Sequence, residues 1–215
     1  MTSPAMAVSP RRSAERWADL CILVCSLLLG TAGAIALVVA TFARRDTRLL
    51  IGVAIYAAGL LAMLGSSLAY HAAAGSPRRG LLRRFDHAAI FAMIAGTVTP
   101  FALSLGDAVW GSAATAAVWA AAAIGIVVKL RSPPTGARQS AIPYLILSWV
   151  SAAALVPSVS PATGLQLAAG GVLYTVGVTF YLWRRLPFHS AIWHAFVLAG
   201  AACHYLAIVD GVVMA

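Results

Sequence analysis

Seven long apolar segments, separated by short polar connections, dominate this chain of 215 residues. The segments lie at approximately 18–42, 49–70, 86–105, 108–128, 140–158, 163–183 and 190–212. A helix of about 20 apolar residues crosses the hydrocarbon core of a bilayer, and each segment is near that length. Within lipid, every backbone polar group must be hydrogen-bonded inside the structure, which excludes isolated strands. The sequence therefore predicts an all-α polytopic membrane protein, a bundle of seven transmembrane helices.

The composition agrees with this class of protein. Hydrophobic residues make up 61% of the chain and charged residues only 10%, whereas soluble domains contain about 25% charged residues. The connections are too short to hold a separate domain, so we expect residues 1–17 to form an N-terminal tail and residues 18–215 to form one transmembrane domain. The first apolar run is long enough to span the membrane and is followed by no typical cleavage site, which favours a retained signal anchor.

The positive charges indicate the orientation. Short loops rich in Lys and Arg stay in the cytoplasm. If the N-terminus is cytoplasmic, only Arg44, Arg45 and Arg48 of the 15 cations fall outside. We therefore expect an inner-membrane protein with its N-terminus in the cytoplasm and its C-terminus outside. The net charge of +9 then reflects topology, so we expect membrane lipid as a partner and no nucleic acid, and nothing indicates an obligate protein partner.

Several ionisable residues come to one depth in this topology. His71 ends the second segment at the cytoplasmic side, with Ser67 one turn deeper on the same face. Asp86 opens the third segment, and His189 and His194 lie in the first turns of the seventh. Ionisable groups in membrane segments are costly and are therefore functional candidates.

Histidines with a neighbouring carboxylate are suited to a divalent metal site. Catalytic zinc has three protein ligands and an open position for water, and a nearby carboxylate can take a proton from that water. Ser67 could hydrogen-bond the water or the Asp86 carboxylate. Similar ligands also bind iron or manganese. The alternative is that each polar side chain only caps a helix or lies at the membrane interface.

Other ionisable residues fit this site less well. His204 lies about 15 Å farther along the seventh segment, and we expect it to be a buried, hydrogen-bonded histidine. His87 points about 100° away from its neighbouring carboxylate on a helix, which disfavours it as a ligand. Asp19, Asp107 and Asp210 border segments without a histidine nearby, and we interpret them as interface residues.

Three motifs carry a family resemblance. They are Ser67-x-x-x-His71, the stretch FDHAAIFAMIAGTVTP at 85–100 and the block FHSAIWHAFV at 188–197. With them, essentially the whole chain resembles the bacterial hemolysin III proteins, within the wider progestin and adiponectin receptor family. The resemblance implies a seven-helix fold of the orientation above. It also implies a zinc ion near the cytoplasmic face, held by His71, His194 and a third ligand.

The third ligand departs from the family pattern. Receptor-like members have His-x-x-x-His, but Ser190 stands four residues before His194, and the histidine is His189. Five helical residues turn through about 500°, so His189 would lie about 140° from His194. If the helix begins after Pro187 with Ser190 as its N-cap, His189 is free to fold back. We predict His189 as the third ligand, with Asp86 or a second water as the alternative.

The resemblance also implies a function. Family members are similar to membrane ceramidases in the placement of these residues, are suspected of zinc-dependent hydrolysis of lipid amides, and in bacteria are linked to membrane-lipid homeostasis. We therefore predict a zinc-dependent hydrolase of lipid amides or esters, in which Asp86 activates water and Ser67 orients water or substrate. The alternatives are a non-enzymatic sensor of membrane state with structural zinc, and a pore-forming cytolysin, since some members are named for hemolysis.

Overall fold

The computed structural model describes residues 10–104, 108–131 and 137–214. Its long helices are α1 (Pro10–Ala43), α2 (Thr47–Ala72), α3 (Arg79–Ser104), α4 (Ala108–Arg131), α5 (Ala137–Leu155), α6 (Pro161–Leu182) and α7 (His189–Ile208). A 3₁₀ turn (Val156–Ser158) follows α5, and a π-helical turn (Val209–Val213) extends α7. No strand occurs among these residues, which confirms the all-α prediction.

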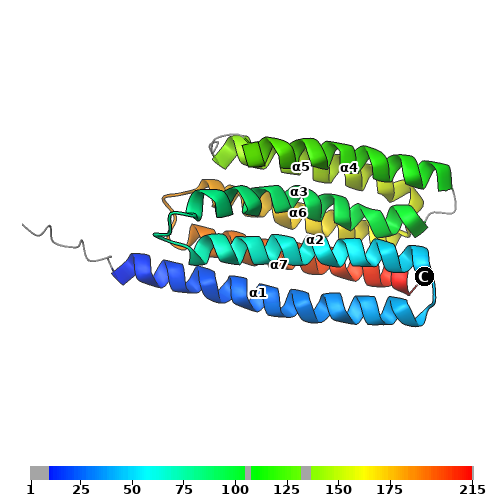
Figure 1. Cartoon of the computed structure of the whole chain (residues 1–215), viewed down its shortest axis with the longest axis horizontal. Coiled ribbons are helices and arrows are strands. Elements are labelled where there is room, and N and C mark those ends of the chain that lie inside the picture. Colours follow the sequence, from blue (N-terminus) through cyan, green and yellow to red (C-terminus); the bar gives the residue numbers. More distant parts are fainter. Residues whose placement is uncertain (1–9, 105–107, 132–136, 215) are drawn as a thin grey trace, which may run out of the picture.

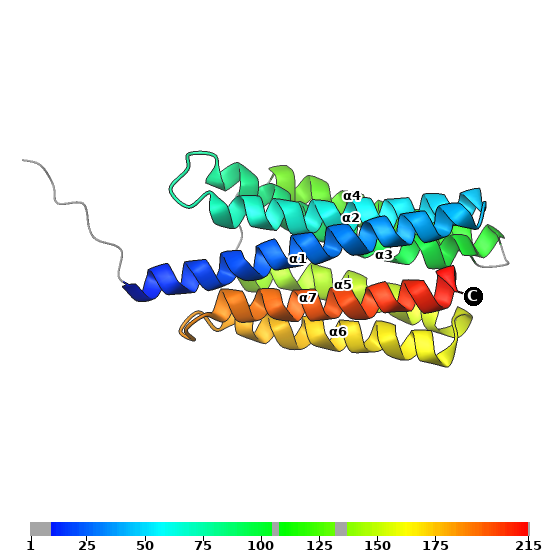
Figure 2. The same cartoon turned by 90° about the horizontal axis from the view of Figure 1, so that it is seen from below.

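The helices lie side by side and alternate in direction along the long axis of the bundle (Figure 1). We call the end at which α1, α3, α5 and α7 begin the N-terminal end; it is on the left in Figure 1. α1 and α7, the first and last helices of the chain, are neighbours in the bundle (Figure 2). The end of α2 and the starts of α1, α3 and α7 therefore meet at the N-terminal end.

Seven of the described helices are long and apolar enough to cross a membrane. Large apolar side chains such as Leu28, Phe42, Ile124 and Leu165 are exposed on the outside of the bundle, where a bilayer would cover them. These features support a multi-pass membrane protein. The orientation of its termini remains a prediction.

Two helices begin about two turns earlier than the apolar segments predicted for them. α1 begins at Pro10, a residue type favoured in the first helical turn. α3 begins at Arg79, so the prediction that Asp86 opens the third helix is wrong: Asp86 lies two turns inside it. Arginine is a good helix former, and its long side chain keeps the charge in water while the backbone stays helical.

Glycines bring α2 and α3 into close contact. A Cβ atom on Gly59 would lie 3.2 Å from the Ala92 carbonyl oxygen, and one on Gly96 would lie 3.2 Å from the Ile55 carbonyl oxygen. Small residues allow such close approach between membrane helices. This contact fixes the position of α2, which carries two of the predicted site residues, relative to α3, which carries a third.

Candidate metal centre

Three side chains from different helices meet at the N-terminal end: Asp19 of α1, His71 of α2 and His194 of α7. The His194 Nδ1 atom lies 2.6 Å from Asp19 Oδ1, and His71 Nδ1 lies 3.2 Å from Asp19 Oδ2. The two imidazole rings pack edge to face, with centroids 4.7 Å apart. One potential ligand atom from each residue lies within 4.8 Å of the other two. Asp19 and His194 are buried, and His71 is half-buried.

The interpretation of Asp19 as an interface residue without a histidine nearby is wrong. Asp19 faces both His71 and His194, and its Oδ2 atom also accepts a hydrogen bond from Ser190 Oγ at 3.2 Å. The depth of Asp19 in the membrane was a signal in the sequence, because Asp19 opens the first apolar segment at the same end of the bundle as His71 and His194. What the sequence could not show is that α1 lies beside α7.

The start of α7 also differs from the expectation. Phe188, with φ of 58°, is the N-cap residue, and the helix begins at His189. The prediction of Ser190 as the N-cap is therefore wrong. The Ser190 hydroxyl donates a hydrogen bond to Asp19 instead. With His189 inside the helix, its ring leaves the axis about 140° from that of His194.

His189 is not part of the group formed by Asp19, His71 and His194. Its Nδ1 atom is buried and has no hydrogen-bond partner among the described residues. Its predicted role as a ligand stays a prediction.

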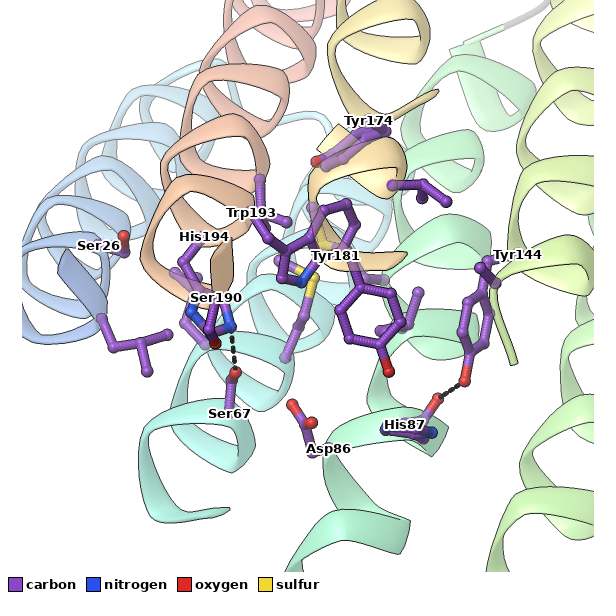
Figure 3. A pocket seen from close by; sticks show the side chains of 18 of the residues that line it. Ser26, Ser67, Asp86, His87, Tyr144, Tyr174, Tyr181, Ser190, Trp193 and His194 are labelled. Atoms are coloured by element: carbon purple, nitrogen blue, oxygen red, sulfur yellow. Dashed lines mark hydrogen bonds between the residues drawn. The ribbon is translucent and has the colours of Figure 1, made fainter. Parts of the chain in front are cut away.

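Ser67 and Asp86 lie next to this group. Ser67 is buried, and its Oγ atom is 3.4 Å from His194 Nε2 (Figure 3). The Asp86 side chain faces the same cavity between Ser67 and Tyr181 (Figure 3). The structure thus brings together four of the five predicted site residues, namely Ser67, His71, Asp86 and His194.

Two other ionisable residues, His204 and Asp210, lie apart from the Asp19–His71–His194 group. His204 is buried, and its Nε2 atom hydrogen-bonds the Leu167 carbonyl oxygen at 3.3 Å, as expected. Asp210 accepts a hydrogen bond of 2.6 Å from Gln166 near the opposite end of the bundle. Asp107 lies outside the described residues.

A cavity of about 640 Å³ opens beside the Asp19–His71–His194 group. Arg16, Arg79, Arg83 and Arg184 line it at the N-terminal end, followed by the three residues of this group. Farther in, its walls are mainly apolar and include Met63, Met93, Val98, Leu155, Leu167 and Val197. This volume is typical of a ligand pocket, and the arginine and acidic side chains of the lining are concentrated at one end.

Sequence comparison identifies the family. The family model described as "Haemolysin-III related" matches residues 14–205. This chain belongs to the haemolysin III family. It is 36% identical over 157 residues to the "Hemolysin-3 homolog" of Bacillus subtilis (strain 168), covering 72% of this chain and 74% of that protein. It is 40% identical over 126 residues to "Hemolysin-3" of Bacillus cereus, covering 57% and 58%.

Part of the chain is also similar to a human protein. The "Monocyte to macrophage differentiation factor" of Homo sapiens is 46% identical over 67 residues, which are 30% of this chain and 28% of the human protein. That relative is a member of the progestin and adiponectin receptor family, so the predicted resemblance is confirmed. No solved structure matches the chain.

The donor atoms of this haemolysin III family protein fit a divalent metal ion. Imidazole nitrogen and carboxylate oxygen are ligands that zinc accepts. The His71 Nδ1 atom is buried, has no hydrogen-bond partner among the described residues, and faces the Asp19 carboxylate at 3.2 Å. Two ligand atoms about 2.0–2.2 Å from one tetrahedral ion lie a little over 3 Å apart, so this pair has suitable spacing.

Proposed function

We propose that this haemolysin III family protein is a zinc-dependent hydrolase of an amide or ester bond in a membrane lipid, and that it acts in membrane-lipid homeostasis. The observation that carries the proposal is the largely buried Asp19–His71–His194 group, which lies beside Asp86 at the charged end of a cavity whose deeper walls are mainly apolar. Three protein ligands leave an open position for substrate or water, whereas structural zinc sites are normally closed by four.

We assign Asp19, His71 and His194 as the ligands. Asp19 takes the place predicted for His189, because its carboxylate already faces both histidines, whereas His189 leaves α7 in another direction. The same donors accept iron or manganese, so zinc is the ion proposed and metal analysis decides its identity.

The chain's own residues supply the remaining chemistry. When bound, the ion would act as a Lewis acid on the scissile carbonyl and acidify a water. Asp86 takes the proton of the water that attacks the carbonyl carbon and passes it to the leaving nitrogen or oxygen as the C–N or C–O bond breaks. The Ser67 hydroxyl donates a hydrogen bond to the developing oxyanion. The apolar cavity holds the acyl chain.

The distribution of Lys and Arg supports a cytoplasmic N-terminus. The polar end of the cavity would then open at the inner leaflet of the cell membrane. This arrangement favours a lipid substrate over a pore, because a pore needs polar groups along its whole length, and the deep part of this cavity is mainly apolar.

The proposal is tested on protein purified in a non-ionic detergent. The wild type should contain about one zinc ion per chain, and incubation with a mixed lipid extract should deplete one lipid class. His194→Ala should lose both the zinc and the activity. His204→Gln, which changes another buried histidine of α7, should keep the zinc.

Two outcomes would contradict this scheme. Zinc retained at the wild-type level in His194→Ala would rule out the metal assignment. A zinc-loaded wild type that leaves every lipid intact would favour the non-enzymatic sensor.

A second mechanism has one specific observation in its favour. Asp19 Oδ1 contacts His194 Nδ1, and His194 Nε2 lies 3.4 Å from Ser67 Oγ, which is the atom order of a Ser-His-Asp triad. Ser67 Oγ would then attack the carbonyl carbon, its proton would pass through His194 to the leaving group as the C–N or C–O bond breaks, and water would hydrolyse the acyl ester on Ser67. Labelling of Ser67 by a fluorophosphonate in metal-free protein would support this mechanism, and hydrolysis lost on metal removal would oppose it.

A further inference from the structure

Four arginines line the polar end of the cavity, and three of them are exposed: Arg16, Arg79 and Arg184, with Arg83 half-buried. We call these four residues the cavity mouth. We propose that the cavity binds a lipid with a single acyl chain and a phosphate-bearing headgroup, and that the mouth holds this headgroup. Hydrolysis of the bound lipid rests on the proposed function, but binding of the lipid does not.

The arginines of the mouth come from three parts of the chain. Arg16 belongs to α1, Arg79 and Arg83 belong to α3, and Arg184 lies between α6 and α7. Arg16 donates a hydrogen bond of 3.1 Å to the Ala72 carbonyl oxygen, and the Arg79 guanidinium lies 5.2 Å from the centre of the Tyr70 ring. These contacts hold two of the guanidinium groups at the mouth. The planar fork of arginine suits a phosphate with two parallel hydrogen bonds.

Asp86 lies one turn from Arg83 on α3 and interacts with its charge, but negative charge at the mouth does not cancel the charges of Arg16, Arg79 and Arg184. Glu15, Asp19 and Asp86 are the acidic residues among the described cavity-lining residues. Glu15 lies 3.3 Å from Arg11, which is not part of the lining, and Asp19 faces the two histidines. A phosphate would therefore meet a positively charged site.

Topology alone does not account for this placement. The positive-inside rule predicts arginines at one end of the bundle, but not which of them face a cavity. Arg79 and Arg184 line the cavity, whereas their chain neighbours Arg78 and Arg185 do not. Comparing a substitution of each lining arginine with a substitution of its chain neighbour therefore distinguishes binding at this site from a general effect of net charge.

The depth of the cavity fits one acyl chain. On α7 the lining runs from His189 to His204, and its part beyond His194 covers ten residues or about 15 Å, which is half of the roughly 30 Å hydrocarbon core. The volume of about 640 Å³ is that of a pocket for one drug-sized molecule, and is too small for two chains and a headgroup.

The positions of Arg79 and Arg83 relative to Asp86 also fit the place of the bond to be hydrolysed. Arg83 and Arg79 precede Asp86 on α3 by three and seven residues, which is about 5 and 10 Å along the axis. All three line the cavity. A headgroup at the mouth and an acyl chain in the apolar part would place the connecting ester or amide beside Asp86 and Ser67.

Binding is measured by titration calorimetry of the full chain in a non-ionic detergent. The ligands are a 1-O-alkyl glycerophosphate, the 1-O-alkyl glycerol with the same chain, and inorganic phosphate alone. The ether bond cannot be hydrolysed as an ester or amide, so the result does not depend on catalysis. Since charge-assisted hydrogen bonds are strong, the ether phosphate should bind at least about tenfold more tightly than the ether glycerol.

Matched double variants locate the headgroup. Arg79→Gln with Arg184→Gln should weaken binding of the ether phosphate by about tenfold or more and leave binding of the ether glycerol unchanged. Arg78→Gln with Arg185→Gln removes the same net charge and should stay within about twofold of the wild type. Both proteins are checked for an unchanged melting temperature.

Three results would overturn the proposal. The first is equal affinity for the ether phosphate and the ether glycerol. The second is an equal loss in both double variants, which would show a general charge effect. The third is inorganic phosphate binding as tightly as the lipid, which would identify a site for free phosphate. If the ether phosphate binds as expected but no lipid is hydrolysed by the wild type, the proposed function fails and the headgroup site stands.

Discussion

The imidazole of His194 lies against the Asp19 carboxylate, with 2.6 Å between Nδ1 and Oδ1, and so joins two helices whose contacting residues are 175 positions apart. Both side chains are buried. Because an unpaired polar group at such a site carries a desolvation penalty, the contact stabilises the packing of α1 against α7 and also orients one candidate ligand.

Replacing Asp19 should separate the two candidate third ligands. Asp19→Ala should lose zinc and lower the free energy of unfolding by about 1–3 kcal/mol, because it leaves the buried His194 without its partner. His189→Ala should keep the zinc. Metal content by mass spectrometry and thermal unfolding in detergent provide the measurements, and the reverse pattern of metal loss would make His189 the ligand.

Replacing Asp86 should remove the proposed general base and leave the proposed metal site intact. Asp86→Asn keeps the size of the side chain but cannot take the proton of the attacking water, so kcat should fall by about 10²–10⁴-fold. The zinc content should equal that of the wild type. Wild-type turnover in this variant would exclude Asp86 as the general base.

Replacing Ser67 should distinguish an oxyanion donor from a nucleophile. Ser67→Ala removes one hydrogen bond to the transition state, so kcat should fall by about 10²–10³-fold with little change in KM. The residual activity should still require metal. Activity lost completely, together with fluorophosphonate labelling of the wild type at Ser67, would favour the triad mechanism.

The glycine contact between α2 and α3 should be sensitive to added volume. Gly59→Val places a side chain against Ala92 and Met93, and overpacking of this kind costs about 1–3 kcal/mol. Gly65→Val is the control, because a Cβ atom there has nothing within 4 Å. The melting temperature should fall only in the first variant, and equal melting temperatures would contradict the close contact.

The orientation can be tested in intact cells. Cys21, Cys25 and Cys203 are first replaced by serine, and one new cysteine is then added, as Thr47→Cys or Ser76→Cys. A cytoplasmic N-terminus places Thr47 outside and Ser76 inside, so an impermeant maleimide should label only Thr47→Cys. Labelling of Ser76→Cys alone would invert the bundle.

Part of the site followed from the sequence because depth is a local property. A helix rises about 1.5 Å per residue, and each crossing reverses the chain direction. The positions of Ser67, His71 and His194 within their apolar segments therefore brought them to one end. For Asp86 the helix boundary was misplaced by two turns, yet its depth was still close enough to place it beside Ser67.

The sequence alone determined the class of protein, the seven apolar spans and the end of the bundle at which the histidines lie, because hydrophobic length and the alternation of spans depend only on local composition. The tertiary structure decided which side of each helix faces the cavity and which helices are neighbours. Packing contacts such as that of Gly59 with α3, and the pairing of Asp19 with His194, set those rotations. For this reason the sequence did not show that Asp19 faces the two histidines, and the role of His189 as a ligand stays a prediction.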